Sequence, residues 1–181
     1  MPEEERGPLV QLPRSARVDP VPEGDARVGQ IRLALPDRGS AVTVLIIEVD
    51  DGSVRGLLCG EDWPLATETD AVLEPWQSGC PGRLLVHGDV SAAILNRRLS
   101  RVLGAITPEI VERIVLRGLH RDFDTHDLGR GRPILDRDDP RWEWKLEQLT
   151  RVRGVRARAS EVGFTLHESG RGGRGGRDSA A

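Results

Sequence analysis

Apolar residues are most concentrated between positions 42 and 59 of the chain. Residues 42–49 are apolar apart from Thr43 and Glu48, and such a nearly continuous run is typical of a strand covered on both faces. An Asp-Asp-Gly-Ser sequence and a second apolar run follow. Asp-Gly between two apolar runs is a strong hairpin signal, because Gly adopts the positive φ of a tight turn and Asp tolerates it. The sequence therefore predicts a β-hairpin at the centre of a small sheet.

Shorter extended segments surround this hairpin. Residues 27–35 alternate between apolar and polar side chains, which predicts a half-exposed first strand. Residues 71–75 form a short strand that stops at a proline, and residues 83–88 form another that stops at a glycine. We expect these segments to complete the sheet.

Three segments carry helical signals. The first is residues 91–101, where Ile94, Leu95 and Leu99 fall on one side. The second begins at Thr107-Pro108, with Thr as N-cap and Pro at the first helical position, and ends at Gly118.

The third predicted helix, residues 141–153, has Trp142, Leu146 and Leu149 at positions i, i+4 and i+7. Such a stripe indicates the face that packs on the domain. We therefore expect Trp142 to be covered and Trp144 to be the more exposed tryptophan.

These segments predict an α+β fold with one compact domain, since 181 residues suit a single domain with appendages. The compact domain spans residues 27–118, and a polar loop with the third helix spans 119–160. We expect a disordered, proline-rich leader at 1–26 and a flexible Arg/Gly-rich tail at 161–181.

Composition excludes some functions. The net charge of −3 gives the whole molecule no bias toward nucleic acid or membranes, so any such bias must be local. No apolar stretch approaches the roughly 20 residues of a membrane span, and the first residues lack a signal-peptide pattern, so we expect a cytoplasmic protein. Cys59 and Cys80 form no CxxC pair, and we expect buried free thiols rather than a disulfide.

The order of these segments resembles the MazF/PemK family of bacterial toxins. Gly29-Gln30-Ile31-Arg32 stands where that family has its opening Gly and first strand, and Thr43-Val44-Leu45-Ile46-Ile47 is similar to its Pro-Val-Leu-Val-Ile strand. Two later segments, 84–90 and 103–109, are similar to the family's final strand and the start of its last helix. The resemblance covers about residues 28–117.

The resemblance implies a small SH3-like β-barrel with C-terminal helices. It also implies metal-independent cleavage of single-stranded RNA, usually by a homodimer that is paired with an antitoxin protein. The family's arginine before the central strand falls near Val42, with Arg38 the nearest arginine upstream, and its Thr or Ser after the next strand falls near Cys59. No cofactor and no membrane are implied.

RNA cleavage through a 2′-hydroxyl needs a base, an acid and a cation for the phosphorane charge. Polar residues in or beside the central hairpin could meet at one end of the sheet and supply these groups. The candidates are Arg38, Ser40, Arg55, Cys59 and Glu61. The alternative is that they are ordinary loop residues and a packed cysteine.

The C-terminal region is locally basic. Residues 151–177 hold seven Arg against Glu161 and Glu168, a local charge of +5. Such an arm can hold a phosphate backbone without sequence preference, or it can simply keep the protein soluble. The candidate nucleic-acid contacts are Arg151, Arg153, Arg156 and Arg158.

Residues 120–127 contain two His and three Asp, which are ligand types for a transition metal. Because they fall in a predicted loop rather than on rigid elements, we expect a solvated polar loop and no metal site. Two hypotheses remain. One is an RNA-cleaving toxin with substituted site residues, and the other is a non-catalytic barrel that binds a protein or nucleic acid through its C-terminal extension.

Overall fold

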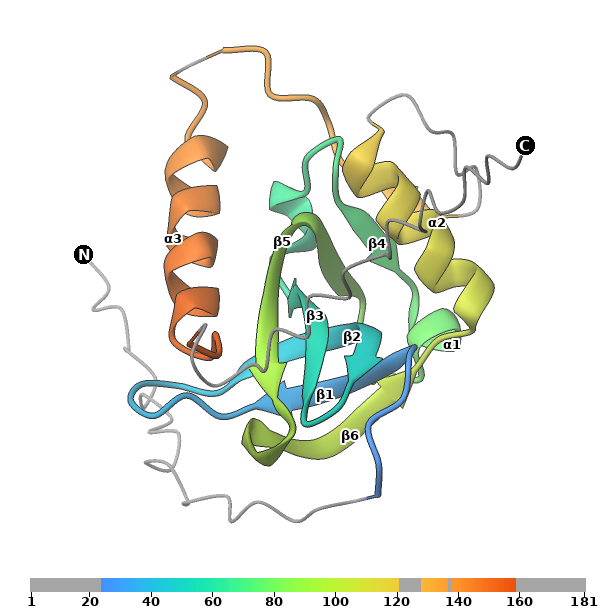
Figure 1. Cartoon of the computed structure of the whole chain (residues 1–181). Helices are drawn as coiled ribbons and strands as arrows, with labels where there is room; N and C mark the ends of the chain where they lie inside the picture. The colour runs from blue at the N-terminus through green and yellow to red at the C-terminus, as the bar shows by residue number, and fades with distance from the viewer. Residues whose placement is uncertain (1–23, 121–127, 137, 159–181) are drawn as a thin grey trace, which may run out of the picture.

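The computed structural model describes residues 24–120, 128–136 and 138–158. Within these residues the chain forms a seven-stranded sheet with the strand order β6-β1-β2-β3-β5-β4-β7 (Figure 1). The strands are β1 Gln30–Ala34, β2 Val42–Asp50, β3 Ser53–Gly60, β4 Ala71–Leu73, β5 Leu84–Leu95, β6 Leu99–Ala105 and β7 Gly129–Arg130. The helices are α1 Pro75–Ser78, α2 Pro108–Leu119 and α3 Arg141–Arg153.

The predicted central hairpin is formed by β2 and β3. These strands pair antiparallel from Thr43 opposite Cys59 to Asp50 opposite Ser53, and Gly52 in the turn has a φ of +80°. The register shifts between Ile46 and Glu48, which leaves Ile47 without a direct partner. Because of this bulge Ile47 is only half-buried, whereas Leu45 is fully buried.

The predicted helix at residues 91–101 is wrong. Strand β5 runs on to Leu95, a 3₁₀ turn at Asn96–Arg98 follows, and β6 returns along β1. Pairing with β3 decides the outcome, because residues 91–95 form ladder pairs with residues 53–57. The buried residues Val90, Ala92 and Ile94 have the period of two that a strand requires.

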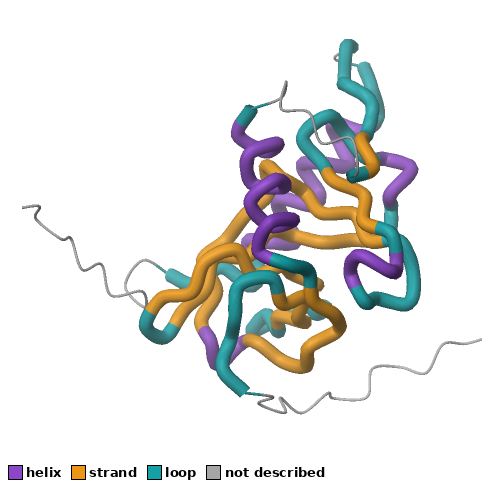
Figure 2. The backbone as a smooth tube through the Cα atoms, turned by 90° about the vertical axis from the view of Figure 1, so that its right-hand side faces the viewer, coloured by secondary structure: helices purple, strands orange, loops and turns teal. Residues whose placement is uncertain are grey.

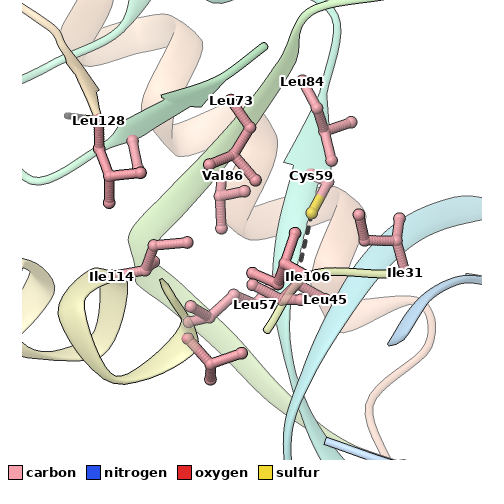
Figure 3. Close-up of a cluster of buried hydrophobic side chains, with 12 residues drawn as sticks. Ile31, Leu45, Leu57, Cys59, Leu73, Leu84, Val86, Ile106, Ile114 and Leu128 are labelled. Carbon is pink, nitrogen blue, oxygen red and sulfur yellow. Dashed lines mark hydrogen bonds between the residues drawn. The ribbon is translucent and has the colours of Figure 1, made fainter. Parts of the chain in front are cut away.

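Both faces of the sheet are covered, as the apolar run of β2 predicts. On one face α2 packs over a cluster of buried side chains, shown in Figure 3, that includes Leu45, Leu57 and Ile114. On the other face Val44, Ile46 and Leu58 pack with Val152 at the end of α3 and with Val155 just beyond it. In Figure 1, α2 and α3 lie on opposite sides of β5.

The strands curve strongly rather than forming a flat layer (Figure 2). The prediction of an α+β fold, a small SH3-like β-barrel with C-terminal helices, is confirmed by the curved antiparallel sheet and its helices. Helices α2 and α3 lie where their sequence signals placed them. Most of the predicted leader and all of the predicted tail lie outside the described residues. None of the helices in the described part of the chain is long and apolar enough to cross a membrane.

Candidate functional site

The five catalytic candidates do not come together. Arg55 lies in the half of the hairpin near the turn, where it pairs across the ladder with Glu48 and forms an ion pair of 3.3 Å with it. Cys59 is four residues further along β3, which is about 13 Å in an extended strand. The structure therefore separates Arg55 from the other end of the sheet.

Cys59 belongs to the hydrophobic core. Its side chain is buried, and its Sγ donates a hydrogen bond to the carbonyl oxygen of Leu57 at 3.7 Å (Figure 3). Burial, followed by the nearby Cys80, raises the pKa of the Cys59 thiol well above its usual range. A protonated, enclosed thiol cannot act on a dissolved polymer. Both cysteines are free thiols, as predicted.

The remaining candidates are exposed. Arg38 and Ser40 lie in the loop between β1 and β2, and Glu61 follows β3 directly. Of these three, Glu61 lines a hollow of about 780 Å³ at this end of the sheet, and the strand residues Leu33 and Thr43 line it too.

A second hollow of about 700 Å³ is lined in part by the same residues, Trp63 and Arg83. We call the two hollows together the Trp63 groove. Besides Glu61, its charged lining residues are Arg83 and Arg101 in the first hollow, and Glu74, Arg83, Arg130, Arg132 and Arg141 in the second.

Trp63 is the central side chain of this groove. It starts the 3₁₀ turn Trp63–Leu65 immediately beyond the end of β3, with Pro64 in the first turn, and 41% of it stays exposed. The guanidinium carbon of Arg83 lies 4.7 Å from the centre of the Trp63 ring system, a cation–π contact. Arg83 also forms an ion pair of 2.9 Å with Glu74.

The arginines of the second hollow differ in their exposure. Arg141 donates to Asp139 and to the carbonyl oxygens of Arg132 and Pro133, so it holds the wall together. Arg130 and Arg132 are exposed on either side of Gly131. A side chain at position 131 would collide with the backbone of Ala66, so this glycine lets the segment lie against the groove wall.

An aromatic face beside several guanidinium groups is a surface that stacks a nucleobase and attracts phosphate. Sequence reasoning identified Glu61 but missed Trp63, Arg83 and Arg101. The cation–π pair joins residues 20 positions apart, and nothing in the local pattern signals it.

A separate polar cluster lies under α3. Lys145 Nζ lies 2.6 Å from Asp70 Oδ1, 2.7 Å from Asp89 Oδ1 and 3.4 Å from His87 Nδ1. Thr67 donates to the other oxygen of Asp70 through its backbone N–H and its hydroxyl, at 2.8 and 2.9 Å. We call these five residues the Lys145 cluster.

The chemistry of the cluster explains its residue types. An ammonium has its donors on one compact atom, which suits the two carboxylates of Asp70 and Asp89 that converge on it, whereas the planar guanidinium of an arginine does not. Lys145 is the single lysine among 26 basic residues, a signal in the sequence that was open to this interpretation. Burial raises the pKa of Asp70, but the hydrogen bond from His87 and the charge of Lys145 outweigh it and lower that pKa.

Asp70 and His87 are fully buried and Lys145 nearly so, and only Asp89 at the edge of the Lys145 cluster is exposed. The cluster therefore fastens α3 rather than meeting a polymer. The ring of Trp144 lies 5.1 Å from that of His87 and covers it. This arrangement contradicts the predicted orientation of α3. Lys145, Gln148 and Val152 face the domain, while Trp142, Leu146 and Leu149 are exposed.

The four C-terminal arginine candidates, Arg151, Arg153, Arg156 and Arg158, are exposed and lie outside the lining of the Trp63 groove. Beyond α3 the chain runs beside β5, where the N–H of Ala157 donates to the carbonyl oxygen of Ala93 at 2.7 Å. Successive side chains of this segment point to opposite sides, so Val155 and Ala157 are buried and Arg156 and Arg158 are exposed.

In the described part of the chain, no group of three or more His, Cys, Asp or Glu side chains is arranged to hold a metal ion. The His- and Asp-rich loop of residues 120–127 lies outside the described residues except for His120, so the expectation of a solvated loop stays a prediction.

No protein-family model matches the chain, and no curated protein matches it. Similar solved structures include a mycobacterial endoribonuclease in complex with its cognate antitoxin (18% identity, TM-score 0.41, 52% of this chain and 95% of that one). The Mycobacterium tuberculosis toxin MazF-mt6 is also similar (18% identity, TM-score 0.40, 53% and 99%). A third is a mycobacterial endoribonuclease (17% identity, TM-score 0.39, 52% and 88%). Each of these matches covers about half of this chain.

Proposed function

We propose that the chain binds single-stranded RNA in the Trp63 groove. The observation that carries the proposal is Trp63, which stays 41% exposed with Arg83 over its ring, together with further exposed arginines in both hollows. A nucleobase can stack on a side chain only when it is not stacked between neighbouring bases of a duplex, as in a single strand. The guanidinium groups of Arg101, Arg130 and Arg132 then follow the phosphates.

We further propose that the bound strand is cleaved at the hollow that Glu61 shares with Arg83 and Arg101. Glu61 accepts the proton of a 2′-hydroxyl, whose oxygen attacks the adjacent phosphorus. The bond to the 5′-oxygen breaks, and this oxygen takes a proton from water. The products are a 2′,3′-cyclic phosphate and a 5′-hydroxyl end. The arginines stabilise the negative charge of the phosphorane.

The resemblance to the MazF/PemK family supports this reading, and it adds that the protein acts as one half of a toxin–antitoxin pair. The cytoplasmic location expected from the sequence is part of the proposal. The proposed partners are RNA, an antitoxin protein and a second copy of the chain. Arg38, Ser40, Arg55 and Cys59 have no role in the proposed step, because none of their side chains lines the Trp63 groove.

Binding without cleavage is the second candidate function. One observation favours it, namely that within the described residues no histidine lines either hollow, so Glu61 has no ready acid as a partner. Expression in bacteria separates the two functions. A working RNase slows growth and creates new 5′-hydroxyl ends in total RNA, whereas a binding protein creates none and still shifts a labelled single-stranded RNA.

A further inference from the structure

The outer face of α3 carries an apolar stripe that the domain leaves uncovered. Trp142 is 46% exposed, Leu146 61% and Leu149 37%. These residues repeat at i, i+4 and i+7, the spacing of a helix face that packs on another surface. The described chain covers them only in part, because α3 turns Lys145, Gln148 and Val152 toward the sheet instead.

A small hollow of about 140 Å³ lies beside this stripe. It is formed by Trp142, Leu146 and Leu149 together with the 67–69 segment, Val90 and Ile134. Sites for drug-sized ligands are roughly 300–1,000 Å³, so this hollow is too small for one. A pocket that receives a single anchoring side chain from a protein partner is of this order.

Acidic groups border the stripe on both sides. On the side of the domain, the hollow is lined by Asp89, whose side chain is 42% exposed, and by the buried Glu68. Glu143 and Glu147 are exposed on the far flank of the helix. The nearby cations are outnumbered, because Lys145 pairs with both Asp70 and Asp89, and Arg141 pairs with Asp139 and also interacts with the charge of Glu68. This negative border disfavours nucleic acid and favours a partner whose own border is basic.

We propose that the stripe of Trp142, Leu146 and Leu149 is a docking surface for a basic amphipathic helix of a partner protein. The apolar side of that helix packs along the stripe and places one side chain in the hollow, and its Lys or Arg residues meet the acidic borders. A second copy of α3 fits less well. In a two-fold pair of antiparallel helices the same flank of each helix meets, so Glu143 and Glu147 would face their own copies.

Two labelled synthetic peptides test the proposal on the full chain by fluorescence anisotropy. One has leucines at i, i+4 and i+7 with lysines on both flanks, and the other has glutamates in place of the lysines. We expect the lysine peptide to bind at least about tenfold more tightly. Leu146→Ser should weaken its binding about tenfold, whereas Leu119→Ser, at an equally exposed leucine on α2, should not.

Charge reversal completes the test. Glu143→Lys with Glu147→Lys should weaken binding of the lysine peptide and strengthen binding of the glutamate peptide. Equal affinity for the two peptides, or equal effects of Leu146→Ser and Leu119→Ser, would overturn the proposal. So would a concentration-dependent dimer in sedimentation that Leu146→Ser abolishes, because a second copy would then occupy the stripe.

Discussion

Lys145 Nζ lies 2.6 Å from Asp70 Oδ1, and this ion pair joins α3 to the segment that leads into β4. Both partners are buried, and Asp70 is fully enclosed. Breaking a buried pair by removing one partner leaves the other charge without compensation, which typically costs about 3–5 kcal/mol. The position of α3, and with it the exposure of the Trp142 stripe, depends on this contact.

Lys145→Met should therefore lower the free energy of unfolding by about 3–5 kcal/mol in a denaturant titration. Lys145→Arg should not restore it fully, because a planar guanidinium cannot replace the single-atom donor between Asp70 and Asp89. Arg153→Met, on an exposed position of the same helix, should change stability by no more than about 0.5 kcal/mol. Equal effects of Lys145→Met and Arg153→Met would contradict this role.

The pH dependence of the unfolding free energy should reveal the contribution of ionised Asp70 in the Lys145 cluster. Because the folded-state pKa of Asp70 is lowered, its ionised form stabilises the fold above the unfolded pKa of about 3.9. That stability is lost as the pH falls through the lower, folded pKa. The difference in unfolding free energy between wild type and Asp70→Asn should therefore shrink between about pH 5 and pH 3. A constant difference over this range would show that Asp70 does not titrate as inferred.

The sequence predicts elements well where local signals and long-range pairing agree. The hairpin of β2 and β3 and the helix α2 carry turn and cap signals that no other structure satisfies as well. At residues 91–95 the apolar spacing fits both the helical period of 3.6 residues and the strand period of two. Pairing with β3 selects the strand. Local pattern cannot contain that information.

The candidate sites show the same limit. The apolar stripe of α3 predicts the wrong buried face, because the helix is fastened by Lys145 instead. The partners of Lys145 come from residues about 55 to 75 positions away. Glu61 was found because it follows the hairpin directly. Trp63 and Arg83 meet only through the fold.

Core substitutions should distinguish Leu45 from Ile47. Both residues lie in the apolar run that predicts a strand covered on both faces, but Ile47 is half-buried at the bulge of β2. Leu45→Ala should cost about 2–5 kcal/mol, the range for a buried aliphatic side chain. Ile47→Ala should cost clearly less, and a loss at Ile47 as large as that at Leu45 would argue against the bulge.

RNA affinity should depend on Trp63. Trp63→Ala should weaken binding of a short single-stranded RNA by about 1–3 kcal/mol, the typical contribution of one stacked base. Trp76 is 80% exposed and does not line the Trp63 groove, so Trp76→Ala is the matched control and should leave affinity unchanged. If both variants bind alike, the strand does not stack on Trp63.

Cleavage should depend on the groove and not on the hairpin core. Removing a general base typically costs about 10²–10⁴ in rate, and removing an electrostatic donor costs about 10²–10³. Glu61→Gln and Arg101→Ala should therefore stop the appearance of 5′-hydroxyl ends on induced expression. Arg97→Ala, at an exposed arginine outside the groove, should not. Cys59→Ser places a hydroxyl in the core, so it should lower stability and leave the cleavage rate of the folded protein unchanged. If Glu61→Gln cleaves as wild type does, another group is the base; if wild type creates no new ends and still binds the strand, the groove is a binding site alone.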